Sequence, residues 1–251
     1  MTSRDQRVVV VTGASGGIGA ALGELLIDRG DAVALVARRD GVLRTVAERA
    51  GPNAHPIAAD VTHRDDVRRV VRESLDRFGR VDVWVNNVGQ GITRLPSELT
   101  DDDVDEMVRV NVKSALYGTQ EILPHFKERG AGHLINVSSM LGRMPLAVFR
   151  SAYNGAKHFL NALTANFRAE LAKDWPGIQV SLVSPGVVRT EFGTNALHGG
   201  PDSRSLSYSQ SAEEVAAVIA AVIDSPRPDV YTRAGARERV LEYLGGLGVD
   251  P

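Results

Sequence analysis

The sequence of 251 residues contains no cysteine. Disulfide bonds, thiolate metal sites and cysteine nucleophiles are therefore excluded. The formal net charge is only −2, so the chain lacks the basic surplus expected of a protein that binds nucleic acid or an anionic membrane. It also lacks an apolar run near the ~20 residues that a membrane-spanning helix needs. These absences predict a cytoplasmic protein with neither nucleic acid nor membrane as a partner.

Nor does the sequence show a recognisable signal peptide or metal-binding motif. The apolar stretch in the opening MTSRDQRVVVVTG is too short for a signal peptide. The six histidines show no metal-ligand spacing such as His-x-x-x-His, so no metal site is expected. What is present, 43% hydrophobic and 24% charged residues, is ordinary for a folded globular protein.

Short β-branched segments alternate with longer segments of helical pattern. The expected strands cover residues 7–12, 32–37, 55–59, 81–86, 133–138, 178–183 and 230–231. Their nearly continuous hydrophobicity is typical of a parallel sheet covered by helices on both faces. Thr62, Thr100 and Ser211 each precede an acid by three residues and are candidate helix N-caps. We therefore predict an α/β protein: one doubly wound Rossmann domain over residues 1–251, with about seven strands.

One segment does not fit this alternation. Residues 186–210 are rich in Gly, Ser and Asn and have no clear periodicity. Loops of that length within compact domains are often lids over a site, so we expect a substrate lid there. The last residues, 245–251, also resemble neither helix nor strand.

A glycine-rich segment, TGASGGIG over residues 12–19, follows the first expected strand and precedes a helix. Its glycines permit a tight turn, close approach of the backbone to a pyrophosphate, and close packing of helix on strand. The helix N-terminus offers free N–H groups and a positive dipole end to the phosphates. This context predicts a dinucleotide site. Its members are Gly13, Ser15, Gly16, Gly17, Ile18 and Gly19.

The end of the second expected strand bears on which dinucleotide is bound. NAD-specific sites place an acid there to hold the ribose 2′-hydroxyl, whereas an arginine suits a 2′-phosphate. Ala37 takes the acid's place, and Arg38 and Arg39 follow. Each guanidinium can bind a phosphate through two charge-assisted hydrogen bonds. We therefore predict NADP(H) as the cofactor, with Ser15 adding a hydrogen bond.

Asp40 keeps NAD(H) open as the alternative. It lies about twenty residues beyond Gly19, the interval expected for a ribose-binding acid. It also lies three residues after the strand end and could cap a helix from Val42. The capping interpretation is favoured.

Tyr153 and Lys157 lie four residues apart in a segment of helical composition, with Ser151 as a candidate N-cap. Residues at this spacing share one helix face, so the hydroxyl and the ammonium can address one site. A free tyrosine with a pKa near 10 is a poor base, and a nearby cation favours its phenolate. Lowering that pKa by about three units requires roughly 4 kcal/mol. The pair predicts a proton donor and acceptor.

The sequence resembles the short-chain dehydrogenase/reductase family in its shorter single-domain branch. The resemblance extends from the first strand to about Thr190, and the motifs occur in the family's order. They are TGASGGIG at 12–19, Asp60-Val61, NNVG at 86–89, Asn111, Ser138-Ser139, Tyr153 with Lys157, and Pro185-Gly186 with Thr190.

The resemblance implies four catalytic residues. Tyr153 would be the general acid in reduction and the base in oxidation. Lys157 would hold the nicotinamide ribose and lower the tyrosine pKa. Ser139 would bind the substrate oxygen, where charge develops as hydride arrives. Asn111 would hold a water that connects Lys157 to solvent. The further cofactor contacts it implies are Asp60 and Val61 beside the adenine, Asn87 and Gly89 in the cleft, and Pro185, Gly186, Val188 and Thr190 at the nicotinamide.

Two positions depart from the family pattern. Val88 replaces the usual alanine of the NNAG motif and adds two methyl groups near the adenine ribose. Ser139 lies one position farther from Tyr153 than the family spacing implies, and that spacing would fall on Met140. We interpret this as a one-residue insertion within residues 146–150 and assign Ser139, leaving Ser138 a structural role.

The predicted function is interconversion of a carbonyl (ketone, aldehyde or oxoacyl) and an alcohol with NADP(H), with reduction as the favoured direction. A non-catalytic NADP(H)-binding sensor or scaffold, and an NAD(H)-dependent alcohol dehydrogenase, are the alternatives. Family members form dimers or tetramers through two long helices, here near 104–128 and 151–173. The substrate is expected to be largely apolar. Candidate pocket residues are Gln90, Ile92, Leu141, Met144, Val148, Phe149, Val187 and Phe192, whereas His198 in the lid is interpreted as a surface residue.

Overall fold

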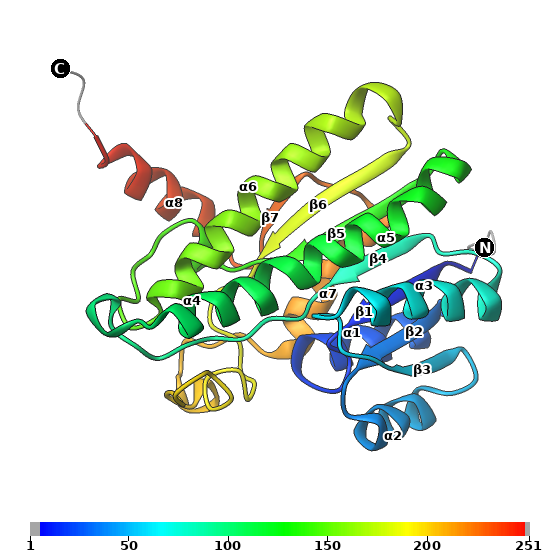
Figure 1. Ribbon diagram of the computed structural model, residues 1–251, viewed down its shortest axis with the longest axis horizontal. Coiled ribbons are helices and arrows are strands. Elements are labelled where there is room, and N and C mark those ends of the chain that lie inside the picture. Colours follow the sequence, from blue (N-terminus) through cyan, green and yellow to red (C-terminus); the bar gives the residue numbers. More distant parts are fainter. Residues whose placement is uncertain (1–5, 249–251) are drawn as a thin grey trace.

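The computed structural model describes residues 6–248. The ends of the predicted domain, residues 1–5 and 249–251, lie outside the described residues, including the last part of the tail expected to be irregular. Helices cover both sides of one central sheet (Figure 1). This arrangement confirms the predicted doubly wound α/β fold.

The sheet has seven strands in the order β3-β2-β1-β4-β5-β6-β7, and all described pairs are parallel. Each predicted strand is present, with boundaries shifted by two residues at most. The strands are β1 (Val8–Thr12), β2 (Ala32–Ala37), β3 (Ala54–Ala58), β4 (Val83–Asn86), β5 (Gly132–Val137), β6 (Ile178–Ser184) and β7 (Asp229–Tyr231).

The helices divide between the two faces of the sheet. They are α1 (Gly17–Asp28), α2 (Asp40–Ala50), α3 (Arg64–Phe78), α4 (Asp101–Val108), α5 (Ser114–Arg129), α6 (Ser151–Asp174), α7 (Ala212–Asp224) and α8 (Ala236–Gly245). Short 3₁₀ turns occur at η1 (Pro96–Glu98), η3 (Met140–Gly142) and η4 (Ser203–Ser205), and η2 (Arg109–Lys113) is a π-helical turn that joins α4 to α5.

Strand β1 shows why the strand sequences are hydrophobic throughout. Val9 and Val11 pack in a core with α1, α2 and α7, whereas Val8 and Val10 pack in a second core with α3, α5 and α6. Successive side chains of a strand point to opposite faces, so a strand covered on both sides buries every residue. All five residues of β1 are buried accordingly.

The strand order reverses direction between β1 and β4, which are neighbours although β2 and β3 intervene in the sequence. In open parallel sheets such a reversal leaves a crevice outside the carboxyl ends of the two strands, where ligands bind. The glycine-rich segment follows β1 and the NNVG motif follows β4, so both line this crevice.

The helix caps are as predicted at two positions and different at two others. Thr100 and Ser211 each form a capping box with the acid three residues on. Thr62 does not cap α3, because its hydroxyl donates to the Asp60 carboxylate instead. Ser151 is the first residue of α6 rather than its cap, and its hydroxyl donates to a backbone carbonyl.

The segment 186–210 contains one short 3₁₀ turn, and backbone contacts anchor it at two places. Val188 pairs with Gln210 across the base of the segment. Further out, Leu197 donates from its N–H to the Gly91 carbonyl at 2.8 Å and accepts from the Thr93 N–H at 2.9 Å. The outer part of the segment is therefore tied to the loop after β4.

His133 on β5 is a buried titratable group, with 5% of its surface exposed. Its Nε2 lies 2.8 Å from the Ser181 hydroxyl, and its Nδ1 has no hydrogen-bond partner among the described residues. Burial lowers the pKa of His133 to about 4, because the charged imidazolium would lose its hydration.

This burial predicts an acid-dependent loss of stability. Between pH 6.5 and pH 4 the unfolded chain takes up a proton on His133 that the folded chain resists, so folding should lose about 3 kcal/mol from this group. Urea unfolding at pH 7 and pH 4 should show a smaller loss for His133→Gln than for the parent protein. Equal losses in the two proteins would contradict the prediction.

Candidate active site

The glycine-rich segment brings α1 against β1 with almost no space between them. A Cβ on Gly19 would lie 2.3 Å from the Gly13 carbonyl oxygen, a distance that no side chain tolerates. Gly13 and Gly17 adopt φ values of +72° and +53°, which favour glycine. Helix α1 begins at Gly17 with no side-chain cap, so its first N–H groups are available to a phosphate.

The same segment is bordered by the loop after β6 and by the end of β2. A Cβ on Gly17 would lie 3.1 Å from the Thr190 methyl carbon, and one on Gly16 would lie 3.7 Å from Arg39 Nη2. Glycines here keep open a cradle that side chains would fill. A pyrophosphate fits such a cradle, which has backbone donors at its floor and a cation at its rim.

Arg39 turns toward the glycine segment, where its Nη2 donates to the Ser15 hydroxyl at 3.2 Å. Asp40 is the first residue of α2 and accepts from Arg44 at 2.8 Å, so the predicted capping role is wrong: Arg39 itself occupies the cap position. The acid is engaged on the surface of its own helix, whereas Arg39 faces the cradle.

Asp60 and Val61 follow β3 at the same edge of the sheet. Burial opposes ionisation of Asp60, but hydrogen bonds from Thr62 and the charges of Arg38 and His63 together hold the pKa of its carboxyl below the usual value. Arg38 therefore lies close enough to Asp60 to act on its charge. Arg38 and Arg39, both predicted at the dinucleotide, thus lie beside Asp60 and Ser15 respectively.

The NNVG motif closes the crevice from the β4 side. Asn87 donates through its amide to the Thr12 carbonyl at 3.0 Å and is thereby fixed beside the glycine segment. A Cβ on Gly89 would lie 3.1 Å from Asn111 Oδ1 and 3.4 Å from Lys157 Nζ. The valine that departs from the family pattern, Val88, packs against the core beside Gly13.

Tyr153 and Lys157 lie on consecutive turns of α6 and are 5% and 3% exposed. The ammonium lies 5.7 Å from the centroid of the phenol ring and donates to the Val137 carbonyl, at the end of β5, at 3.1 Å. The predicted pair is thus brought together, with the cation anchored on the sheet.

The direction of the tyrosine pKa differs from the expectation. Burial raises the pKa of Tyr153 to about 12, and a hydrogen bond with Ser139 and the charge of Arg150 only partly oppose that rise. Burial also lowers the pKa of Lys157 to about 8. The expectation considered the cation but not the loss of water around the phenol, which penalises the phenolate. In the protein alone, Tyr153 is an acid.

Of the two serines after β5, Ser139 is the one beside the tyrosine. Its hydroxyl accepts from the Leu141 N–H at 3.1 Å and takes part in the hydrogen bond that opposes the rise of the Tyr153 pKa. Ser138 instead donates to Asn161 at 2.5 Å within the core. The spatial neighbours thus agree with the assignment made from the sequence despite the altered spacing.

Asn111 lies in the π-helical turn η2 and is fully buried. Its amide donates to the carbonyls of Gln90 and Met107 at 2.9 and 3.1 Å, and its Oδ1 accepts from the Gln90 N–H at 3.1 Å. π-helical turns are often found at functional sites because the widened turn frees or redirects a side chain. Here the turn directs Asn111 toward the loop that carries Gly89.

The residues after β6 pass beside Tyr153 and Ser139, which together we call the reacting end. Pro185 accepts from the Met140 N–H at 2.8 Å, and Gly186 lies near the Arg233 side chain. Val188 packs partly against the core, and Thr190 reaches Gly17. Together with Ile18 and Val61, these positions surround the crevice at its carboxyl-terminal edge.

Among the candidate pocket residues, Phe192 comes closest to the reacting end. Its ring packs edge-on against Tyr153, with centroids 5.5 Å apart. Ile92 and Leu141 belong to the same apolar cluster as Tyr153. Val148 and Phe149 are exposed by 59% and 40%, so the structure does not bring them into that cluster.

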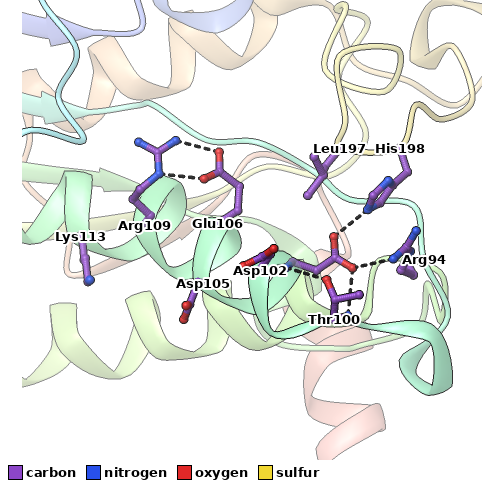
Figure 2. A pocket seen from close by; sticks show the side chains of 10 residues that line it. Arg94, Thr100, Asp102, Asp105, Glu106, Arg109, Lys113, Leu197 and His198 are labelled. Carbon is purple, nitrogen blue, oxygen red and sulfur yellow. Dashed lines mark hydrogen bonds and ion pairs between the residues drawn. The ribbon is translucent and has the colours of Figure 1, made fainter.

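His198 is a residue whose role the sequence did not indicate. Among the non-glycine residues described, it alone has a positive φ, of +64°. Its Nε2 lies 2.6 Å from Asp103, which also pairs with Arg94 at 3.0 Å and completes the capping box of α4 with Thr100. In Figure 2 the side chains of His198, Arg94 and Thr100 converge on one carboxylate. His198, Thr100 and Arg94 hold the pKa of Asp103 at about 2, with the His198 hydrogen bond as the largest cause. Asp103 therefore both caps α4 and anchors it to Arg94 and His198.

A surface hollow of about 710 Å³ lies beside this anchor (Figure 2). Most of its lining residues are charged and belong to α4 and η2, and none of the four predicted catalytic residues lines it. Within residues 6–248, no cluster of three or more potential metal ligands is present, and no helix has the length and apolarity to span a membrane.

Comparison with known proteins gives matches along most of the chain. Residues 7–199 match a family model described as short chain dehydrogenase. An uncharacterised oxidoreductase of Bacillus subtilis (strain 168) is 32% identical over 251 residues, which cover 97% of this chain and 69% of the relative.

Two solved structures are similar in fold. A short chain dehydrogenase/reductase from Burkholderia phymatum in complex with NAD has a TM-score of 0.88 at 23% identity, covering 100% of this chain and 99% of the other. An alcohol dehydrogenase from the archaeon Thermococcus sibiricus, complexed with 5-hydroxy-NADP, has a TM-score of 0.79 at 27% identity, covering 90% and 96%.

The contact at Gly19 gives a test of the crevice. Gly19→Ala should separate α1 from β1, reduce the free energy of unfolding by about 1–3 kcal/mol, and weaken dinucleotide binding at least about tenfold. Gly155→Ala is the matched control, since a Cβ there meets no atom within 4 Å and its φ is not positive. Thermal unfolding and fluorescence titration measure both effects. Binding by Gly19→Ala as tight as in the control would refute the close-approach argument.

Proposed function

The chain belongs to the short-chain dehydrogenase family, and from that premise we propose that it interconverts a carbonyl and an alcohol with NADP(H) as cofactor. The family predicted from the sequence is confirmed, and with it a nucleotide-binding oxidoreductase. The observation that carries the finer proposal is the joint burial of Tyr153, Ser139 and Lys157 at the mouth of the glycine-lined crevice.

The residues of the crevice suit such a dinucleotide. The N–H groups at Gly16–Gly19 would hold the pyrophosphate, and Arg39 with Ser15 and Arg38 would hold a 2′-phosphate. Asp60 and Val61 would lie beside the adenine. At the other end, Lys157 would bind the nicotinamide ribose. Asn87, Gly89, Pro185, Gly186, Val188 and Thr190 would enclose the remaining part. When bound, the nicotinamide supplies a hydride to the carbonyl carbon or removes one from the alcohol carbon.

The proposed proton transfer takes place at the Tyr153 oxygen. A raised pKa keeps this phenol protonated, so it can donate to the carbonyl oxygen as negative charge develops there. The Ser139 hydroxyl would donate to the same oxygen. Below about pH 8 Lys157 is positively charged, and its field lowers the cost of the phenolate that remains. Asn111 would hold the water that returns a proton from solvent.

We propose reduction as the favoured direction, because cells usually keep the NADP(H) pool reduced. The apolar side chains of Ile92, Leu141 and Phe192 around the tyrosine support a substrate with a largely apolar body. Residues 186–210 are proposed as the lid over it. A homodimer or homotetramer through α4–α5 and α6, and a cytoplasmic location, complete the proposal.

Two other functions have specific support. NAD(H) specificity is supported by the Burkholderia phymatum neighbour, whose complex contains NAD, and by the presence of Asp40 near the end of β2. A non-catalytic sensor or scaffold needs only the crevice. Burial of three further polar groups at its mouth is costly for binding alone, which disfavours this alternative.

Arg39 provides the test of cofactor choice. Arg39→Ala should weaken NADPH binding about 10- to 100-fold through the lost charge-assisted hydrogen bonds, with little change for NADH. Arg49→Ala, which changes an exposed arginine on α2, is the control. Fluorescence titration with both dinucleotides measures the ratio. Tighter binding of NADH than NADPH by the parent protein would support the NAD(H) alternative.

Tyr153→Phe tests the reaction itself. A screen of NADPH oxidation against ketones, aldehydes and oxoacyl thioesters should reveal turnover, and the variant should lose about 10²- to 10⁴-fold in kcat with NADPH affinity unchanged. Tyr117→Phe, on α5, is the control and should keep full activity. Tight NADPH binding without turnover of any carbonyl or alcohol would favour the sensor or scaffold instead.

A further inference from the structure

Arg150 is a buried cation directly in front of the reacting end. It precedes α6, three residues before Tyr153, and only 7% of its surface is exposed. One guanidinium nitrogen, Nη1, donates to the Ile92 carbonyl at 3.0 Å. No carboxylate of residues 6–248 forms an ion pair with it, so most of its donor capacity has no anionic partner.

Such a group is costly unless something compensates its charge. A buried cation loses its hydration, and proteins normally offset that loss with an anion and full hydrogen bonding. Two less buried arginines have such an anion, since Arg94 pairs with Asp103 and Arg143 pairs with Asp229. Burial also lowers the pKa of Arg150. Arg150 thus differs from Arg94 and Arg143 in lacking an acidic partner within residues 6–248.

Two glycines make room for the guanidinium. A Cβ on Gly91 would lie 2.7 Å from Nη1, and one on Gly200 would lie 3.1 Å from Nη2. The same Cβ position on Gly200 is 2.7 Å from the Gly193 carbonyl oxygen and 2.8 Å from the Thr93 hydroxyl, a buried oxygen without a hydrogen-bond partner in the described part of the chain. A cation lacking an anion and a hydroxyl lacking a partner therefore lie around one point, together with that carbonyl.

This point adjoins the reacting end. A Cβ on Gly91 would lie 3.0 Å from Cε1 of Phe192 as well as 2.7 Å from Nη1 of Arg150, so both side chains lie against Gly91. Phe192 in turn packs edge-on against Tyr153. Helix α6 begins at the same place without a side-chain cap, and the positive end of its dipole adds to the field of the guanidinium.

We propose that Arg150 binds a carboxylate of the substrate, with the Thr93 hydroxyl as a second donor. The substrate class is then an oxo acid and its hydroxy acid product, with an apolar body packed against Phe192 and Ile92. In reduction the carbonyl carbon gains a hydride from NADPH and its oxygen gains the Tyr153 proton, while the carboxylate is unchanged. This inference rests on the proposed function and adds an anionic end to its largely apolar substrate.

The test compares acids with their neutral esters. Oxo acids that differ in the number of methylene groups between carbonyl and carboxylate are assayed with NADPH, each beside its methyl ester. For the best spacing, the acid should exceed its ester about 10- to 100-fold in kcat/KM. Arg150→Met should abolish that preference by slowing the acid alone. Arg94→Met, which removes a cation already paired with Asp103, should leave the acid-to-ester ratio unchanged.

A binding measurement separates this inference from the proposed function. Isothermal titration of benzoate into the protein with NADP⁺ present should show binding that Arg150→Met weakens about 10-fold or more, whether or not any carbonyl is turned over. Arg150→Lys retains the charge, and its loss on acids should be smaller; it serves if the methionine variant does not fold. Two results would overturn the inference: an equal loss of kcat/KM on acids and esters in Arg150→Met, or benzoate binding that this variant leaves unchanged. Either would show that Arg150 only holds the loop of Ile92 in place.

Discussion

The parallel direction of the strands is the constraint on which the site depends. Because β1, β4, β5 and β6 all run the same way, the loops that follow them leave the sheet at one edge. Those loops carry the glycine segment, the NNVG motif, Ser139 and Pro185, which are far apart in the sequence. The contact of Gly19 with the Gly13 carbonyl then sets how closely α1 approaches this edge. A dinucleotide cradle follows from backbone packing before any side chain contributes.

The cations near Tyr153 are buried without acidic partners from residues 6–248. Lys157 and Arg150 are both buried cations, and each is held by a backbone carbonyl rather than by a carboxylate. Carbonyl dipoles orient a cation without neutralising it, so its field stays available to a group that arrives later. The raised pKa of Tyr153 belongs to the same picture, because the dry surroundings that sustain this field also disfavour a phenolate.

The sequence predicted what depends on local pattern. Strand positions followed from continuous hydrophobicity, and the cap of α4 followed from Thr100 and Asp103 three residues apart. Family order identified Tyr153 with Lys157, and the altered serine spacing still led to the serine beside the tyrosine. The reason is that each of these features is encoded within a few residues or in an ordered set of motifs.

What the sequence did not predict depends on contacts between distant segments. Nothing near Arg150 indicates that it is buried, since its surroundings come from Gly91 and Gly200. The anchor between His198 and Asp103 joins residues 95 positions apart. Thr62 has the cap spacing, yet Asp60 competes for its hydroxyl. The pKa of Tyr153 is raised rather than lowered as expected, because loss of water around the phenol depends on how the whole molecule packs.

The π-helical turn at Arg109–Lys113 determines which way the side chains of the preceding helix, α4, face. A π-turn is equivalent to one extra residue in an α-helix, and each residue of an α-helix advances the side chains by about 100°. Met107 and Val112 therefore both face the apolar cluster around Tyr153, although an α-helix does not place residues five apart on one side. Loss of a single residue from this turn would restore a regular helix and rotate Asp103 on α4 away from His198. One inserted position thus couples the orientation of Asn111 to the docking of Asp103 against His198.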